Sequence, residues 1–263
     1  MKKLVALALA LVVVLACFAG CGTKGKTLAD IKNAGEIVIA TSPDFPPFEE
    51  LQADGSVVGI EIDIWEAIAE ELGVKLTIKQ MDFEAVLPGI IAGKFDAGVS
   101  GISVTDARKK NSLFTNPYCL AAQAIVVTSD SPIKTKADLD GKTVSVQSGT
   151  TAEEYCLSQN YIVSAFAANS DAEAALTSAK VDAWVIDDLT AAEMVKAYNE
   201  EHEDQLVILD DPMTTEPYAF AFALGSDELV GEINKIVDKL VEDGTVKSFF
   251  DKYEAPYTSP QSK

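Results

Sequence analysis

The sequence predicts an α/β fold with two similar lobes, on the basis of three observations. The chain has 263 residues, enough for one large domain or two medium ones. Strand and helix patterns alternate along it, as in proteins that cover a parallel sheet with helices. Two apolar strands, near residues 121 and 218, separate the alternating segments into two groups. We interpret these two strands as crossovers between the lobes.

The first group of segments has the order β-α-β-α-β after a short N-terminal helix. In one helix, Ile64, Ile68 and Leu72 recur at helical spacing, and Gly73 closes the pattern. Ligands bind beyond the carboxyl ends of the strands in sheets of this kind. We expect strands at 36–41, 75–80 and 97–100, and helices at 27–34, 62–72 and 85–92.

The second group repeats the alternation, and the last helices follow the second crossover. We therefore expect lobe 1 to be discontinuous, with residues 27–121 and 218–263, and lobe 2 to span 122–217. The expected strands are 121–128, 142–147, 162–166, 183–186, 206–209 and 218–224. The expected helices are 134–140, 151–158, 171–180, 189–199, 228–242 and a last one ending near 253.

The composition is that of a globular protein, and its charge argues against nucleic acid as a partner. Hydrophobic residues make up 48% of the chain, and the formal net charge is -20 at pH 7. Such an acidic surface repels phosphates. The only histidine, His202, lies in a charged run that suits a solvated helix end. We expect no metal and no cofactor, because neither a metal-ligand cluster nor a phosphate loop is present in the sequence.

The N-terminus has the pattern of an export signal. Two lysines precede an apolar stretch at residues 4–16, and small residues come directly before Cys21. This junction resembles the lipobox of bacterial lipoproteins, so we predict a signal peptide at 1–20, lipidation of Cys21 and a tether at 21–26. Cys17 is a weaker candidate, and an unmodified signal with incidental cysteines is the alternative. Lipidation would hold the protein at the outer face of the bacterial cell membrane.

Two further cysteines, Cys119 and Cys156, lie in the predicted exported part of the chain. An exported location permits a disulfide. Their spacing does not specify one, so a disulfide and two buried free thiols both remain open.

The stretch from Ser100 to Arg108 is the first candidate for a functional site. It follows an apolar strand and contains the small polar residues of a helix start, where free backbone N–H groups favour an anion. Arg108 is the only arginine of the chain, and its planar guanidinium suits a carboxylate. A surface arginine beside an ordinary helix N-cap is the alternative.

The segment Gly59–Ile64, with Ile68, Ala69 and Leu72 after it, resembles the signature of the family 3 extracellular solute-binding proteins. These are polar-amino-acid receptors of ABC importers. Within the segment, Glu61 and Asp63 are expected to serve the helix N-terminus and not the ligand. Five further segments match at spacings typical of the family: 40–49, 81–83, 100–108, 147–151 and 182–187.

The resemblance implies two Rossmann-like α/β lobes joined by two crossover strands, the type II periplasmic-binding-protein or Venus-flytrap fold. It also implies the residues that bind the amino-acid backbone. Arg108 would bind the α-carboxylate together with the backbone N–H groups of Ser103 and Thr151. Asp187 would accept from the α-ammonium, with the Gly101 carbonyl and the Ser103 hydroxyl as partners. 

The residues around the ligand side chain are less specific. The resemblance places Phe45 and Phe83 against it, although each could instead belong to the core. Ser42, Ser100 and Gln147 would make the pocket polar, which favours an uncharged polar ligand or a broad range.

Two acidic residues have competing roles. Asp44 could reach a basic ligand side chain or cap a local turn. Asp188 is the neighbour of Asp187, and we expect it to cap the helix that begins near Leu189.

The resemblance implies a monomeric, non-enzymatic substrate-binding component of an amino-acid ABC transporter. Its partners would be a free, polar L-amino acid and the permease and ATPase subunits. One alternative is an exported enzyme like cyclohexadienyl or arogenate dehydratase, for which Glu49 and Glu216 are the conspicuous spare carboxylates. A sensory lipoprotein that binds an amino acid is the other alternative.

Overall fold

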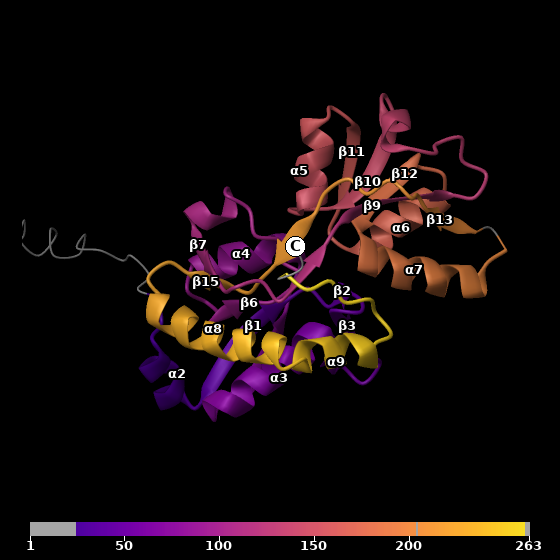
Figure 1. Cartoon of the computed structure of the whole chain (residues 1–263). Coiled ribbons are helices and arrows are strands. Elements are labelled where there is room, and N and C mark those ends of the chain that lie inside the picture. Colours follow the sequence, from indigo (N-terminus) through magenta and orange to yellow (C-terminus); the bar gives the residue numbers. More distant parts are fainter. Residues whose placement is uncertain (1–24, 204, 261–263) are drawn as a thin grey trace, which may run out of the picture.

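The computed structural model describes residues 25–203 and 205–260. Two five-stranded sheets, each flanked by helices, form two lobes that lie side by side (Figure 1). This confirms the predicted two-lobe α/β fold. The predicted signal peptide and the lipidation candidates Cys17 and Cys21 lie outside the described residues. Within these residues, no helix is both long and apolar enough to span a bilayer.

Lobe 1 contains the sheet with strand order β5-β1-β6-β15-β7. β1 (Glu36–Thr41) runs parallel to β5 (Lys75–Gln80) and β6 (Ala97–Gly98), as expected for the β-α-β-α-β order. β15 (Ala221–Ala223) pairs antiparallel with β6 and β7 (Ser112–Phe114), so the chain returns to this sheet after lobe 2. The lobe also has a small sheet of β2 (Asp44–Phe45), β3 (Glu49–Leu51) and β4 (Val57–Val58). Its helices are α2 (Leu28–Ala34), α3 (Ile60–Leu72), α4 (Phe83–Ile91), α8 (Asp227–Glu242) and α9 (Thr245–Lys252).

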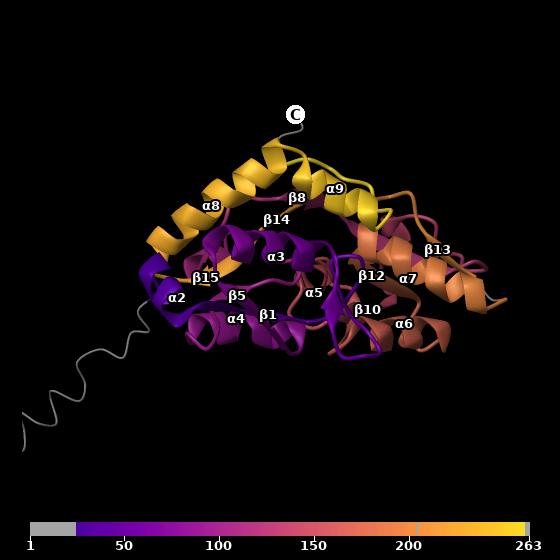
Figure 2. The same ribbon diagram turned by 90° about the horizontal axis from the view of Figure 1, so that it is seen from below.

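The helices α8 and α9 follow one another end to end, and α3 lies alongside them on the same side of lobe 1 (Figures 1 and 2). α3 buries Ile64, Trp65 and Ile68 and ends where Gly73 adopts a left-handed conformation with φ 69°. Trp65 packs edge-on against Phe220, with ring centroids 5.2 Å apart. Burial of these apolar faces accounts for the position of the helices on the sheet.

Lobe 2 contains the sheet with strand order β11-β10-β12-β9-β13. β10 (Thr143–Gln147) runs parallel to β11 (Ile162–Phe166) and β12 (Ala183–Asp187). β9 (Gln123–Thr128) pairs antiparallel with both β12 and β13 (Leu206–Ile208). The helices of this lobe are α5 (Thr151–Ser158), α6 (Asn169–Thr177) and α7 (Asp188–Glu201). His202 is the exposed C-cap of α7, as the charged run predicted.

A two-stranded antiparallel ribbon of β8 (Cys119–Ala121) and β14 (Glu216–Tyr218) connects the lobes. The strands predicted at 121–128 and 218–224 are therefore each divided in two, as β8 with β9 and β14 with β15. The division follows from the change of partner, because each crossover pairs in the ribbon first and then enters the sheet of the next lobe. The lobe boundaries at 121 and 217 stay predictions.

Two predicted helix starts are wrong. Residues 134–140 form only a short 3-10 turn (Lys136–Leu139), and no α-helix begins in 100–108, where only a 3-10 turn follows at Arg108–Lys110. The second segment is held extended by the ribbon, since Val104 N donates to Pro217 O (2.9 Å) and Ala219 N donates to Ile102 O (3.1 Å). These long-range bonds prevail over the local helix pattern.

The cysteines Cys119 and Cys156 are free and buried. Cys119 lies in the β8–β14 ribbon that connects the lobes, called the hinge ribbon below, and Cys156 lies in α5. Of the two alternatives from the sequence, the structure has free thiols. Burial raises the pKa of Cys156 to about 12, so this thiol is protonated and unreactive near neutral pH.

Removal of the Phe250 side chain tests whether the C-terminal helix is part of the core of lobe 1. Phe250 is fully buried in α9, with its ring centroid 4.9 Å from that of Tyr257. We expect Phe250→Ala to lower the free energy of unfolding by about 3–5 kcal/mol, because it leaves a cavity. Lys247→Ala on the exposed face of α9 is the control, and we expect it to stay within about 0.5 kcal/mol of the parent. Equal urea midpoints for both variants would show that α9 adds nothing to this core.

Candidate ligand-binding site

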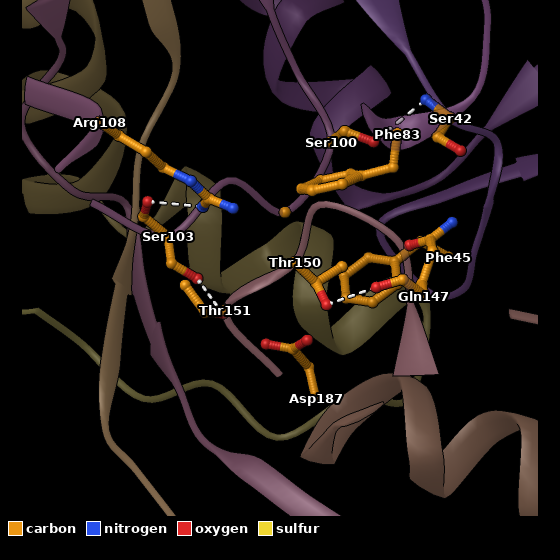
Figure 3. Close-up of a pocket in the computed structure, with 11 residues that line it drawn as sticks. Ser42, Phe45, Phe83, Ser100, Ser103, Arg108, Gln147, Thr150, Thr151 and Asp187 are labelled. Atoms are coloured by element: carbon orange, nitrogen blue, oxygen red, sulfur yellow. Dashed lines mark hydrogen bonds between the residues drawn. The ribbon is translucent and has the colours of Figure 1, made fainter. Parts of the chain in front are cut away.

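A small cavity lies between the lobes, beyond the carboxyl ends of the central strands of both sheets. Its position agrees with the rule that α/β sheets bind ligands at these ends. Ten of the eleven predicted binding residues line it, and the exception is Asp44. The lining residues are Ser42, Phe45, Phe83, Ser100, Gly101, Ser103, Arg108, Gln147, Thr150, Thr151 and Asp187 (Figure 3). That these side chains contact a ligand stays a prediction.

Arg108 contributes a buried positive charge to the cavity. Its Nη1 donates to Ser103 O in lobe 1 (2.9 Å), and its Nη2 donates to Gly149 O in lobe 2 (3.1 Å). Among the described residues, no carboxylate forms an ion pair with its guanidinium. Burial lowers the pKa of Arg108, although an arginine remains charged at physiological pH. The cavity therefore holds a cation without a paired anion.

Asp187 contributes a buried carboxylate to the same cavity. It ends β12, and its Oδ1 accepts from Gln123 Nε2 (3.0 Å) and from the Tyr218 hydroxyl. Burial, reinforced by the charge of Glu216, raises the pKa of Asp187 to about 7. No cationic side chain of the described residues pairs with it. The neighbouring Asp188 does not line the cavity, and its Oδ1 accepts from Leu189 N at the start of α7 (2.9 Å).

Gly101 is held between a buried carboxylate and an aromatic ring. Its N–H donates to Glu61 Oε2 (3.0 Å), and its φ of 53° lies in the left-handed region. A Cβ at this position would lie 2.4 Å from Phe45 Cε1, so only glycine fits. Glu61 thus does more than serve the N-terminus of α3, because it fixes the loop of lobe 1 that lines the cavity.

Two phenylalanines, Phe45 and Phe83, line the cavity. Phe45 is 8% exposed and packs on Phe48, with ring centroids 5.6 Å apart. Phe83 lies under the guanidinium of Arg108, whose Cζ is 5.7 Å from the ring centroid. A cation in this position gains from the ring quadrupole. Both rings thus have structural partners and an exposed face in the cavity.

Gln147 lines the cavity, but its amide is already engaged. Nε2 donates to Asp44 Oδ2 (3.1 Å) and to Ala167 O (3.1 Å), and Oε1 accepts from Asn169 Nδ2 (3.2 Å). The amide groups are therefore not free for a ligand. Asp44 is not among the residues that line the cavity, and its carboxylate accepts from Ser42 in its own loop as well as from residues of lobe 2. Its contact with a basic ligand side chain stays a prediction.

Sequence analysis missed three residues of the site. Thr150 lines the cavity and is the N-cap of α5, where its hydroxyl accepts from Glu153 N (3.2 Å). The sequence does contain a pattern that predicts this N-cap, because the run Ser-Gly-Thr-Thr at residues 148–151 is typical of a helix start. Gln123 and Tyr218 position Asp187 from the two crossovers, and no local pattern distinguishes such residues from other parts of a buried strand.

The two spare carboxylates lie outside the cavity. Glu216 accepts from the hydroxyls of Thr151 (2.7 Å) and Thr214 (2.7 Å) within the hinge ribbon. Glu49 is completely buried beside Glu61, and burial raises the pKa of both groups. Neither is placed as a general acid or base for a molecule in the cavity.

The chain matches the model of the bacterial extracellular solute-binding proteins, family 3, over residues 37–256. It belongs to this family. The chain is 27% identical over 254 residues to the L-cystine-binding protein TcyJ of Escherichia coli K12, and the aligned region covers 93% of this chain and 94% of the relative. It is 29% identical over 261 residues to ABC transporter arginine-binding protein 1 of the same organism, covering 96% and 99%. A crystal structure of a mutant of ArgBP from T. maritima superposes with TM-score 0.80 at 35% identity, covering 86% of this chain and 98% of that one.

These relatives are amino-acid-binding proteins, and one of them is named for an ABC transporter. They confirm the prediction of a substrate-binding protein of an amino-acid ABC transporter. The prediction of a non-enzymatic protein is confirmed by the same relatives. The alternative of a dehydratase-like enzyme is therefore not supported.

We expect the site to reduce the stability of the unliganded protein at high pH. The pKa of Asp187 is about 7 when folded, against about 4 for an exposed aspartate, so the folded state binds its proton more tightly. Stability is therefore lost as pH rises through this window. The free energy of unfolding of Asp187→Asn should exceed that of the parent by roughly 1–3 kcal/mol at pH 8. This difference should shrink toward pH 5. Urea denaturation across pH 5–8 measures it.

The exposed Asp54 provides the control for this variant. Its pKa is lowered by bonds from Ser56, so Asp54→Asn should give no gain in stability at pH 8. A stability difference between Asp187→Asn and the parent that does not vary with pH would show that Asp187 is not ionising in this range.

Proposed function

We propose that the protein captures a free, polar L-amino acid between its lobes and delivers it to the permease and ATPase of an ABC importer. One observation carries the proposal. Arg108 and Asp187 place opposite charges in one buried cavity, and neither has an oppositely charged partner among the described residues. A free amino acid supplies both missing charges, as an α-carboxylate for Arg108 and an α-ammonium for Asp187.

The two charges belong to different lobes, and this division gives a mechanism. A ligand bound to lobe 1 alone satisfies only its carboxylate, by way of Arg108 and the loop at Gly101. Closure about the β8–β14 ribbon adds Asp187 and the N-terminus of α5 at Thr151, whose N–H has no acceptor within the helix. The ligand therefore shifts the population toward the closed form by its difference in affinity for the two forms. The permease would recognise the closed form.

A polar and uncharged ligand side chain is favoured by the remaining surface of the cavity. The serines Ser42 and Ser100 and the rings of Phe45 and Phe83 line it, and Asp187 is the only carboxylate that lines it in the part of the chain that the structure describes. A lysine-like or arginine-like side chain would find no dedicated counter-ion there. The relatives named above bind cystine or arginine, so side-chain preference differs within the family.

We expect Arg108→Ala to lose about 2–5 kcal/mol of binding free energy, because the ligand carboxylate would be buried without a partner. A thermal-shift screen of the twenty amino acids on the parent protein identifies the ligand, since bound ligand raises Tm. Calorimetry with that amino acid then measures the variant.

Lys109→Ala is the matched control, because Lys109 is the exposed neighbour of Arg108 and makes only a surface pair with Asp106. Its affinity should equal that of the parent. If no amino acid shifts the Tm of the parent, or if Arg108→Ala binds equally well, the proposed recognition is wrong.

We also infer that the protein is a lipoprotein exported to the outer face of the cell membrane, with Cys21 as its lipidated N-terminus. Small residues before Cys21 and the preceding apolar stretch support this. Cys21→Ala should move the protein from the membrane fraction to the soluble fraction of the producing cells. Mass spectrometry of the parent should find a diacylated cysteine at its N-terminus. An unmodified N-terminus at another residue would exclude Cys21.

A further inference from the structure

We propose that Asp44 is a latch between the lobes: its carboxylate caps helix α6 of the opposite lobe and stabilises the closed form with any ligand. Asp44 lies on β2 in lobe 1. Its Oδ2 accepts from Asn169 N, the first residue of α6, at 2.8 Å, and from Gln147 Nε2 at 3.1 Å. Asn169 Nδ2 also donates to Asp44 O at 3.4 Å. Three donors of lobe 2 thus converge on one residue of lobe 1.

Helix α6 has no N-cap of its own. Its N-cap residue is Ala168, which makes no side-chain hydrogen bond, although serine, threonine, aspartate and asparagine are strongly preferred at such positions. The first N–H groups of a helix need acceptors, and the positive end of the helix dipole favours an anion. Asp44 supplies both across the cleft. The cap therefore forms only when the lobes are closed.

The surroundings of Asp44 hold it ready for this contact. Ser42 Oγ donates to Asp44 Oδ1 at 2.8 Å within lobe 1, which orients the carboxylate. Asn169 is 2% exposed and Gln147 is 4% exposed, so the donors are protected from competing water when the lobes are closed.

The latch differs from the other polar contacts between the lobes. The bond from Arg108 to Gly149 and the contact between the Ser103 and Thr151 hydroxyls (3.4 Å) both involve residues that line the cavity. A bound amino acid would compete with them. Of the latch residues, Gln147 lines the cavity, but Asp44 and Asn169 do not. The bond from Asn169 N to Asp44 Oδ2 therefore involves no cavity-lining residue, and we expect it to persist in the liganded form.

Two amino-acid probes distinguish a latch from a direct contact with the ligand side chain. L-arginine is cationic and L-glutamine is not. If Asp44 is a latch, Asp44→Ala weakens binding of both probes by the same factor, about three- to thirtyfold, mainly through faster dissociation. If Asp44 instead pairs with a basic side chain, only the arginine affinity falls, and this outcome overturns the latch. Calorimetry and stopped-flow dissociation measure the two quantities.

The distance between the lobes gives a readout that is independent of ligand identity. Nitroxide labels at Lys94→Cys in lobe 1 and Lys180→Cys in lobe 2 report it by pulsed electron paramagnetic resonance. Both positions are exposed, and Cys119 and Cys156, the cysteines of the described residues, are buried. The labelled protein starts after Cys21, so that it carries no other thiol. We expect Asp44→Ala to reduce the closed fraction, measured without ligand and with each probe. An unchanged closed fraction overturns the latch.

Asp54→Asn is the matched control, because Asp54 is an exposed acid in the β3–β4 turn whose bonds stay within lobe 1. It should leave affinity and lobe distance unchanged. A second variant, Asn169→Ala, removes the side-chain donor but keeps the capped N–H, and it should give a smaller effect in the same direction. The effect on affinity presupposes the proposed amino-acid binding, whereas the lobe distance in the ligand-free protein does not. The two proposals can therefore fail separately.

Discussion

The only arginine of the chain connects the two lobes through its guanidinium, and the geometry of the site depends on it. Arg108 donates to Ser103 O on one side of the cleft and to Gly149 O on the other. A buried cation without an anion is unfavourable, and neutral carbonyls compensate only part of the lost hydration. The folded lobes hold the guanidinium in this position because Val104, just after the Ser103 carbonyl, is bonded to Pro217 of the hinge ribbon. The ribbon thus fixes the charge that a carboxylate would neutralise.

The opposite charge is held by the same ribbon. Tyr218 of β14 donates to Asp187, and Gln123, which follows β8, donates to it as well. A carboxylate that lines the cavity therefore shares hydrogen bonds with the segments that connect the lobes. Under the proposed function, a change at Asp187 would alter both ligand binding and the hinge. The unliganded protein keeps two unpaired charges in one cavity, and the apolar cores of both lobes offset that cost. Binding sites that must desolvate charge are expected to be less stable without ligand.

Local patterns were enough to predict most of the fold, whereas most of the predicted site residues, Asp187 among them, came from the resemblance to the family. The period of α3, with Gly73 at its end, and the alternation of strands and helices place Arg108 and Asp187 beyond the ends of strands. The rest depends on pairing between distant segments. Residues 102–104 look like a helix start, but they are bonded to residues 217–219. The partner of Asp44 is Asn169, 125 positions away, and no sequence period reports such a contact.

Positions where the sequence departs from local preference gather where the lobes meet. Ala168 is a poor N-cap, and it is complemented by Asp44 of the other lobe. Gly149 has φ 78°, and a Cβ there would lie 3.1 Å from Glu84 Cβ at the start of α4 in lobe 1. Each feature complements a residue of the other lobe. Both make sense only if the closed arrangement is itself encoded in the sequence, because real proteins tolerate such local conflicts mainly at functional sites. The sequence therefore encodes contacts between the lobes in the arrangement in which Arg108 and Asp187 line one cavity.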